Sequence, residues 1–316
     1  RAAIATAAAL AFTLIASPAE AQFGGLKDAV KKAAQKTPDV SGILQGSPPI
    51  TSNIEDARFA VDSLDNFKPR EAMRSFLTLQ RTPSGGFVLQ PGYYQMDTQS
   101  YCLHAGTYGP GGGDGYLYAP TLGPADDPVM TIVRNSVNHP DIDQHDIQVL
   151  LWAIIARSKF EDLPNGMKVT AARLLTPQML TSLNRSALDL FPDAVLNAAY
   201  AKVPAPVRTV IEAEAKLRKM LINPTTSFSE LERVAVLAGM APNQGEKVPS
   251  GRWSLHPDGY YVRYVPYGYS HTDLQIWVPQ GSPAVGKEFD PATHIAMPGN
   301  TARQRLIQSG RAYKTQ

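Results

Sequence analysis

The sequence predicts an α+β protein with a mainly helical central domain that carries a few strands, plus a small antiparallel β-meander at the C-terminus. Three observations lead to this prediction. Apolar residues recur at helical spacing through most of the stretch from Asp127 to Gly239. After residue 250 the pattern changes to short aromatic-rich runs separated by turn residues, which is typical of antiparallel strands. The apolar fraction of 43% over 316 residues is that of a globular chain.

The first residues, Arg1 to Ala21, predict a signal peptide. A basic start precedes an apolar run from Ala2 to Ile15, and small residues stand where signal peptidase requires them, so we expect cleavage before Gln22. The apolar run is too short to span a bilayer comfortably. We therefore expect an exported protein, in the periplasm, at the cell surface or outside the cell, with no integral membrane segment after signal cleavage.

The chain after the signal peptide divides into three predicted regions. Residues 22–67 are expected to be a linker that contains one short amphipathic helix at residues 26–34. A helix-rich domain is predicted over residues 68–240, and an aromatic β-rich unit over residues 241–316. Near the start of the central domain, strand-like and aromatic segments lead to Cys102, so we expect this cysteine at the end of a strand or in the loop that follows.

The helical part of the central domain has two clear starting points. Asp127 followed by Pro128 is predicted to begin a helix that ends before His139. Asp143 is the predicted N-cap of a second helix, in which residues 147–156 are apolar on nearly every side and therefore buried. Gln148 is the exception in that run, and its buried amide requires hydrogen-bond partners. Further helices are expected at residues 167–175, from Thr176, and at residues 193–202, 205–222 and 228–237.

The C-terminal unit is predicted to contain three antiparallel strands, at residues 250–255, 260–265 and 274–278. The tyrosine and tryptophan residues of these strands predict a small aromatic core, with a glycan-stacking or protein-binding surface as the alternative. One short helix is expected in the tail, at residues 301–308.

Charge and motifs exclude several classes of function. The formal net charge is +2 and the basic residues are scattered, so the sequence has no electrostatic footprint for nucleic acid or an anionic membrane. The glycine-rich loop at residues 106–115 fits neither a dinucleotide fingerprint nor a phosphate-binding loop. The spacing of Asp114, Asp126 and Asp127 does not match a calcium loop. The sequence therefore predicts no cofactor and no metal site.

Cys102 is the single cysteine of the chain, so it cannot form an internal disulfide. Three interpretations compete. The thiol is a small buried apolar group, or it is a nucleophile activated by His104, His139 or His145, as in a cysteine hydrolase. In the third interpretation it forms an internal thioester with Gln148. The thiol then displaces the glutamine amide nitrogen as ammonia, and the acyl group can pass to an amine or hydroxyl of another molecule.

Two half-motifs support the thioester. The first is the aromatic-Cys-apolar sequence Tyr101-Cys102-Leu103, and the second is Ile147-Gln148-Val149-Leu150-Leu151-Trp152, an apolar residue and a glutamine followed by apolar residues and a tryptophan. In their order and separation they resemble the motifs of the bacterial thioester domains of surface adhesins. The resemblance covers about residues 93–156.

That resemblance implies roles for individual residues. Cys102 would be the thiol, Gln148 the acyl donor, and Trp152 a shield one helical turn from Gln148. Tyr101 and Tyr116 would bind beside this pair. The candidate acid or base residues are His104 and His145, and Gln95 and Gln99 are rival acyl donors that lie too close to the cysteine in sequence to match the family spacing.

The sequence thus predicts an exported cell-envelope or surface protein that forms an internal Cys–Gln thioester for adhesion. The partner would be a surface protein or glycan that carries amines or hydroxyls. Such chemistry favours a single covalent event over turnover. The alternatives are a structural or binding envelope protein without chemistry, and a cysteine hydrolase that uses Cys102 with a nearby histidine.

Overall fold

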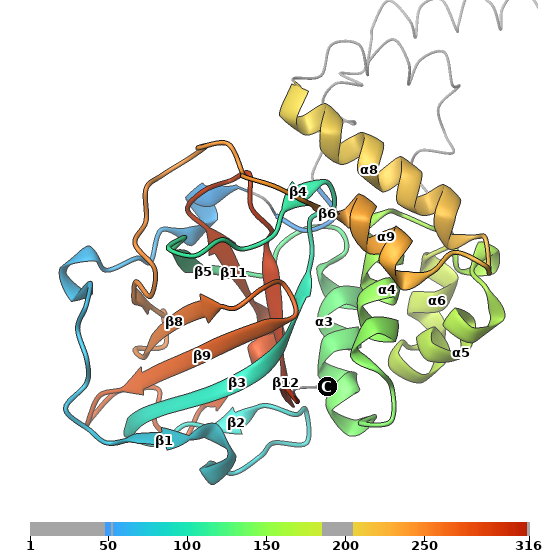
Figure 1. Cartoon of the computed structure of the whole chain (residues 1–316). Helices are drawn as coiled ribbons and strands as arrows, with labels where there is room; N and C mark the ends of the chain where they lie inside the picture. Colours follow the sequence, from blue (N-terminus) through green and yellow to red (C-terminus); the bar gives the residue numbers. More distant parts are fainter. Residues whose placement is uncertain (1–47, 52, 185–204, 315–316) are drawn as a thin grey trace, which may run out of the picture.

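A computed structural model describes residues 48–51, 53–184 and 205–314 (Figure 1). The predicted signal peptide, the predicted helix at residues 26–34 and the predicted helix at residues 193–202 lie outside these described residues.

The main sheet is a closed six-stranded antiparallel β-barrel with two additional strands. Around the barrel the order is β3 (Gly92–Cys102), β12 (Leu306–Ala312), β11 (His294–Pro298), β5 (Tyr116–Pro120), β8 (Tyr261–Pro266) and β9 (His271–Val278). β9 pairs with β3 and closes the barrel. The additional strands are β1 (Met73–Ser75), parallel to β3, and β7 (Ser254–Leu255), antiparallel to β8. Two short pairs are separate: β2 (Phe87–Val88) with β10 (Glu288–Phe289), and β4 (Thr107–Tyr108) with β6 (Val236–Leu237).

Six α-helices of the described residues pack on one side of the barrel, beside β3 and β12 (Figure 1). They are α3 (Asp126–Asn135), α4 (Gln144–Ile155), α5 (Asn165–Leu174), α6 (Pro177–Ser182), α8 (Ala205–Leu221) and α9 (Phe228–Ala235). Short 3₁₀ helices are η1 (Ile54–Ala57), η2 (Asp62–Leu64), η3 (Phe76–Thr78), η4 (Ser136–Asn138), η5 (Phe160–Asp162) and η7 (Pro291–Thr293). Within the described residues no helix combines the length and apolarity that crossing a membrane requires.

The prediction of a mainly helical central domain with a separate meander is wrong. The structure is about 33% helical and 25% strand. β3 and β5 precede residue 240 and the other four barrel strands follow it, so both predicted regions contribute to one barrel. β3 is buried along most of its length, because the barrel covers one of its faces and the helices cover part of the other.

Several local predictions are confirmed. The Asp143 side chain accepts a hydrogen bond from the backbone N–H of His145 at 2.7 Å and caps α4. Strands β7, β8 and β9 form the predicted antiparallel neighbours. The predicted helix at residues 301–308 is wrong, because the chain enters β12 at Leu306 and pairs with β3. Pairing of β12 with its neighbouring strands β11 and β3 outweighs the weak local preference of these residues for a helix.

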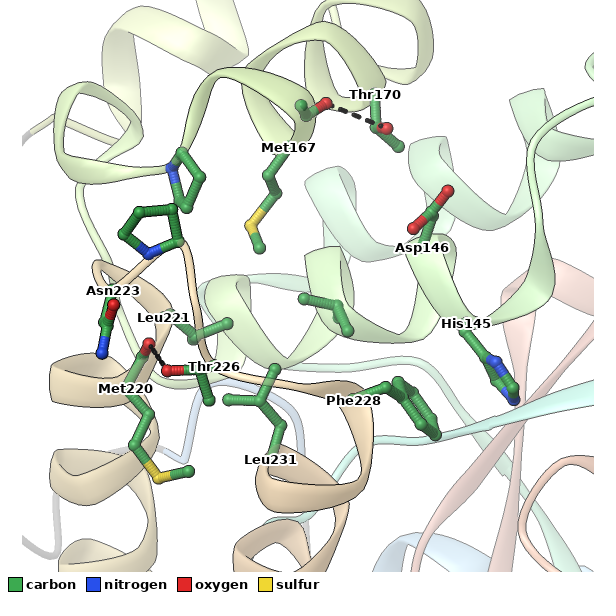
Figure 2. A pocket seen from close by; sticks show the side chains of 14 residues that line it. His145, Asp146, Met167, Thr170, Met220, Leu221, Asn223, Thr226, Phe228 and Leu231 are labelled. Carbon is green, nitrogen blue, oxygen red and sulfur yellow. Dashed lines mark hydrogen bonds between the residues drawn. The ribbon is translucent and has the colours of Figure 1, made fainter.

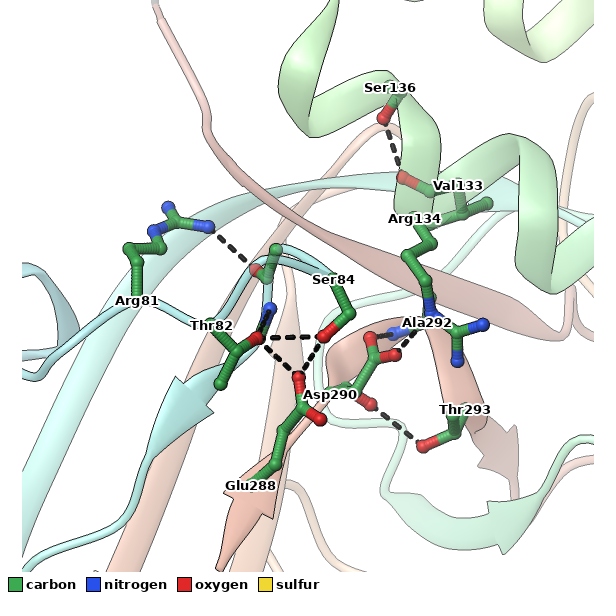
Figure 3. A network of polar contacts seen from close by, with 12 residues as sticks. Arg81, Thr82, Ser84, Val133, Arg134, Ser136, Glu288, Asp290, Ala292 and Thr293 are labelled. Carbon is green, nitrogen blue, oxygen red and sulfur yellow. Dashed lines mark hydrogen bonds and ion pairs between the residues drawn. The ribbon is translucent and has the colours of Figure 1, made fainter.

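Polar contacts fasten the helices to the barrel (Figure 3). Arg134 on α3 forms an ion pair of 2.7 Å with Asp290, which also accepts from the backbone N–H of Ala292 at 2.9 Å. Beside this ion pair, Glu288 of the separate β2–β10 pair accepts hydrogen bonds from the hydroxyls of Thr82 and Ser84. This junction holds the helical layer in place against β12 and the short helix η7.

Candidate functional site

Cys102 is the last residue of β3, at the point where the barrel meets α4. The prediction that it ends a strand is confirmed. Its side chain is fully buried, as are those of Trp152 and Gln304, and Gln148 is 2% exposed. The site is therefore closed to bulk water.

Gln148 binds the main chain of Cys102. Its Oε1 accepts from the backbone N–H of Cys102 at 2.8 Å, and its Nε2 donates to the Cys102 carbonyl at 3.0 Å. The pairing of β9 with β3 ends at Gln99. Beyond that point Gln144 Nε2 donates to the carbonyl of Ser100 at 3.2 Å, so two glutamines one turn apart on α4 replace the missing strand neighbour. The buried amide of Gln148 is thus satisfied.

The sulfur of Cys102 lies under the indole of Trp152. Trp152 Nε1–H donates to Sγ at 3.5 Å, and the backbone of His104 also interacts with the sulfur. Burial raises the pKa of the Cys102 thiol to about 12, although both of these donors favour the thiolate. At neutral pH the group is a thiol.

The thiol donates to a second carboxamide, that of Gln304. Sγ and Gln304 Oε1 are 2.5 Å apart. Ordinary N–H···O bonds span about 2.7 to 3.2 Å, so this contact is short although sulfur is larger than nitrogen. A carbonyl bond is about 1.2 Å long, which places the carboxamide carbon within about 3.7 Å of the sulfur. Reacting atoms in near-attack geometry are about 3 to 3.5 Å apart.

Two backbone carbonyls hold the amide nitrogen of Gln304. Nε2 donates to the Thr107 carbonyl at 2.9 Å and to the Ala235 carbonyl at 3.0 Å. The Ala235 carbonyl also accepts from the backbone N–H of Gly106 at 2.8 Å, beside the short β4–β6 pair. Gly106 has φ +73, and a Cβ there would lie 2.8 Å from that of Ala213, so glycine allows this close approach to α8.

The three candidate histidines have other surroundings. His104 is half-buried, but its Nδ1 is enclosed and has no hydrogen-bond partner among the described residues, and loss of solvation lowers the pKa of the ring well below its usual value. His139 Nδ1 contacts Arg173 at 3.1 Å. The exposed His145 ring stacks on Phe228, with centroids 4.0 Å apart. Among the described residues, no hydrogen bond joins any of these three rings to Cys102 Sγ.

The remaining sequence-predicted residues lie around the barrel. The Tyr101 hydroxyl donates to Gln99 Oε1 at 3.0 Å in the core beneath the helices, and burial raises the pKa of Tyr101 to about 12. Tyr116 belongs to the barrel interior. Gln95 accepts from Gln275 at 3.2 Å, so neither rival glutamine from β3 is joined to the sulfur by a hydrogen bond.

A pocket of about 320 Å³ opens nearby between α4, α5 and the turn from α8 to α9 (Figure 2). His145 and Phe228 line it, and the Phe228 ring stacks on Trp152 with centroids 5.5 Å apart. The indole of Trp152 in turn contacts the sulfur. Two aromatic layers therefore separate this pocket from the thiol.

Comparison of the chain with family models, with curated proteins and with solved structures gave no match. The function must therefore be inferred from the geometry of the site. Among the residues that the structure describes, no three His, Cys, Asp or Glu side chains are grouped so that they could hold a metal ion.

Gln304 is the residue that sequence reasoning missed. It lies between two arginines, two residues before β12, and no local pattern marks it. It reaches the sulfur because Leu306 of β12 pairs with Cys102 of the adjacent strand β3. The only sequence signal for Gln304 is its side-chain carboxamide, since any glutamine after residues 147–152 is a possible acyl donor.

Proposed function

We propose that this chain forms an internal thioester between Cys102 and Gln304 and uses it for covalent attachment to a partner. The observation that carries this proposal is the 2.5 Å contact between Sγ and Gln304 Oε1. The acyl donor differs from Gln148, which the sequence motifs favour, because both polar atoms of the Gln148 amide bind the main chain of Cys102. Gln148 thereby positions the cysteine.

The Cys102 thiol and the Gln304 carboxamide supply every atom and proton that thioester formation requires. The thiol proton passes to Gln304 Oε1, the sulfur attacks the carboxamide carbon, and a proton then moves to Nε2 as the carbon–nitrogen bond breaks. The products are the thioester and one ammonia, with no oxidation or reduction. Direct transfer to a neighbouring oxygen avoids a free thiolate, which the raised pKa of the buried Cys102 thiol disfavours. The N–H of Trp152 stabilises charge that develops on the sulfur.

Burial protects the proposed thioester from hydrolysis. A thioester exposed to water hydrolyses, whereas Cys102, Gln304 and Trp152 are each 0% exposed. The hydrolase alternative requires a lowered thiol pKa, whereas burial raises the pKa of the Cys102 thiol to about 12. A purely structural role would make the Cys102 thiol the donor that the buried Gln304 oxygen needs, and that role, unlike the thioester, requires the full unreacted mass.

The proposed biological setting rests on the sequence alone. The apolar segment at residues 1–21 supports export, and attachment to a surface protein or glycan at the cell envelope fits a buried acyl group that awaits a partner. We propose adhesion as the role. A single covalent event is expected for each molecule.

Intact-mass spectrometry of the full chain tests the thioester. The wild-type mass should be lower by one ammonia than the mass calculated from its observed N-terminus, and Cys102→Ala should restore the calculated mass. After incubation with methylamine, peptide mapping should find the methylamide on residue 304. A folded wild-type protein of full mass contradicts the proposal.

Matched glutamine variants identify the acyl donor. Gln304→Met should abolish the ammonia loss, whereas Gln148→Met should retain it while the far-ultraviolet circular dichroism stays that of the wild type. Methylamine on residue 148 instead of 304 would assign the bond to the other glutamine. This labelling uses the wild-type chain and does not depend on whether either variant folds.

A further inference from the structure

A pocket of about 440 Å³ opens between the end of β12, the loop from η4 to α4 and the chain that follows η3. It shares no lining residue with the pocket in Figure 2, and its volume is within the range of small-molecule sites. Its apolar wall includes Leu77, Val137 and Ile142. Three cationic side chains line the same space: Arg81, Arg311 and Lys314. The pocket therefore combines an apolar surface with positive charge.

Arg311 lies in a bulge of β12, because the register of β12 against β3 shifts between Gln308 and Ala312. Its Nη2 donates to the carbonyls of Ile142 at 2.9 Å and Pro140 at 3.4 Å. Its Nη1 is enclosed and has no hydrogen-bond partner among the described residues. An enclosed donor without a partner is unfavourable, so this guanidinium has hydrogen-bonding capacity left for a ligand.

Arg81 is held beside the same bulge. Its Nη1 donates to the Gly85 carbonyl at 2.7 Å (Figure 3), and its Nη2 donates to the Gly310 carbonyl. A Cβ at Gly310 would lie 2.7 Å from Arg81 Nη1, so glycine allows this approach to the strand. The guanidinium also lies over the Phe87 ring, 4.2 Å from its centroid. Two carbonyls use only two of its N–H groups and leave the others for further acceptors.

Neither guanidinium forms an ion pair with a carboxylate of the described residues. Burial lowers the pKa of Arg81, and no acidic side chain opposes this effect. The two aspartates that line the pocket have other partners. Asp141 pairs with Arg173 at 2.8 Å. Asp143 accepts from the backbone N–H of His145 at 2.7 Å. The positive charge of the pocket therefore remains available to a ligand.

We propose that this pocket binds a small organic acid, with its carboxylate held by Arg81 and Arg311 and its hydrocarbon part against the apolar wall. A guanidinium presents its N–H groups in a fork that matches the two oxygens of a carboxylate. Asp141 and Asp143 repel a second negative charge, so a monoanion is favoured over a phosphate dianion. The site is independent of the proposed thioester.

Isothermal titration calorimetry with hexanoate tests this site on the wild-type full chain. Hexanamide is the matched probe, since it has the same size and shape without the charge. We expect one-site binding of hexanoate with a dissociation constant of about 1 mM or below, about tenfold or more tighter than that of hexanamide, and weakening as sodium chloride is added. Absence of saturable binding, or equal binding of the two probes, overturns the proposal. Tighter binding of inorganic phosphate than of hexanoate overturns the choice of a carboxylate.

Matched variants locate the bound hexanoate. Arg81→Gln and Arg311→Gln should each weaken binding about tenfold or more, whereas Arg70→Gln, at an exposed arginine outside the pocket, should change it less than about twofold. Lys314→Gln, at an exposed position, should weaken binding about two- to threefold and does not depend on whether Arg311→Gln folds. A variant Arg81→Gln with wild-type circular dichroism and wild-type affinity overturns the site. Ammonia loss, read from the intact mass, reports on the thioester separately.

Discussion

Replacement of Gln148 by methionine tests whether its side chain holds the main chain of Cys102 in place. The substitution keeps the length of the side chain and removes both hydrogen bonds to Cys102, the 2.8 Å bond from its N–H and the 3.0 Å bond to its carbonyl. Neither backbone group can turn to water, because Cys102 is 0% exposed. The end of β3 then has an unsatisfied donor and an unsatisfied acceptor.

The magnitude follows from these two groups. A buried polar group left without a partner costs about 1 to 3 kcal/mol, so the pair costs about 2 to 6 kcal/mol. Burial of the apolar methionine side chain offsets part of this. We expect Gln148→Met to lower the free energy of unfolding by about 2 to 4 kcal/mol.

Urea denaturation followed by tryptophan fluorescence measures this loss. Both the variant and its reference should carry Cys102→Ala, so that no covalent bond contributes to stability. Gln178→Met serves as the control, since Gln178 is an exposed glutamine of α6, and a change within about 0.5 kcal/mol is expected there. If Gln148→Met changes stability no more than this control, the amide does not support the strand end as argued.

Three further substitutions test other parts of the structure. Trp152→Phe removes the N–H that faces the sulfur and should slow ammonia loss during folding about tenfold in a time course of intact mass; an unchanged rate would remove the indole from the reaction. Burial raises the pKa of Asp273 from 3.8 to about 6, so the folded chain favours the protonated acid and stability falls as the pH rises from about 4 to 6. Asp273→Asn should abolish this fall of the free energy of unfolding with pH and should raise that free energy at pH 7 by up to about 3 kcal/mol in urea titrations. If the fall with pH remains in the variant, groups other than Asp273 cause it. Tyr269→Phe breaks the hydrogen bond to Glu232 on α9 and should speed the reaction with methylamine, because the last residue of α9, Ala235, binds the Gln304 amide through its carbonyl; an unchanged rate would mean that α9 does not limit access.

Local signals predicted the parts of the site that lie close together in sequence. The acidic cap at Asp143 starts α4, the apolar run after it forces α4 into the core, and the amide of Gln148 then needs partners there. Those partners proved to be the main-chain groups of Cys102, which lies 46 residues earlier. The fold class failed for a related reason, since β3 and β5 pair only with barrel strands that come much later in the chain, β9 and β12 for β3 and β8 and β11 for β5.

No local sequence pattern predicts the contact between Gln304 and Cys102. It lies 202 residues from Cys102, and the register that pairs Leu306 with Cys102 brings it to the sulfur. That register depends on closure of the whole barrel, because β12 must pair with β11 on one side and β3 on the other. A one-residue slip of β12 would turn its side chains to the opposite face and carry Gln304 away from the thiol. The half-motifs therefore locate the cysteine and its supporting helix, while barrel closure determines which carboxamide the sulfur meets.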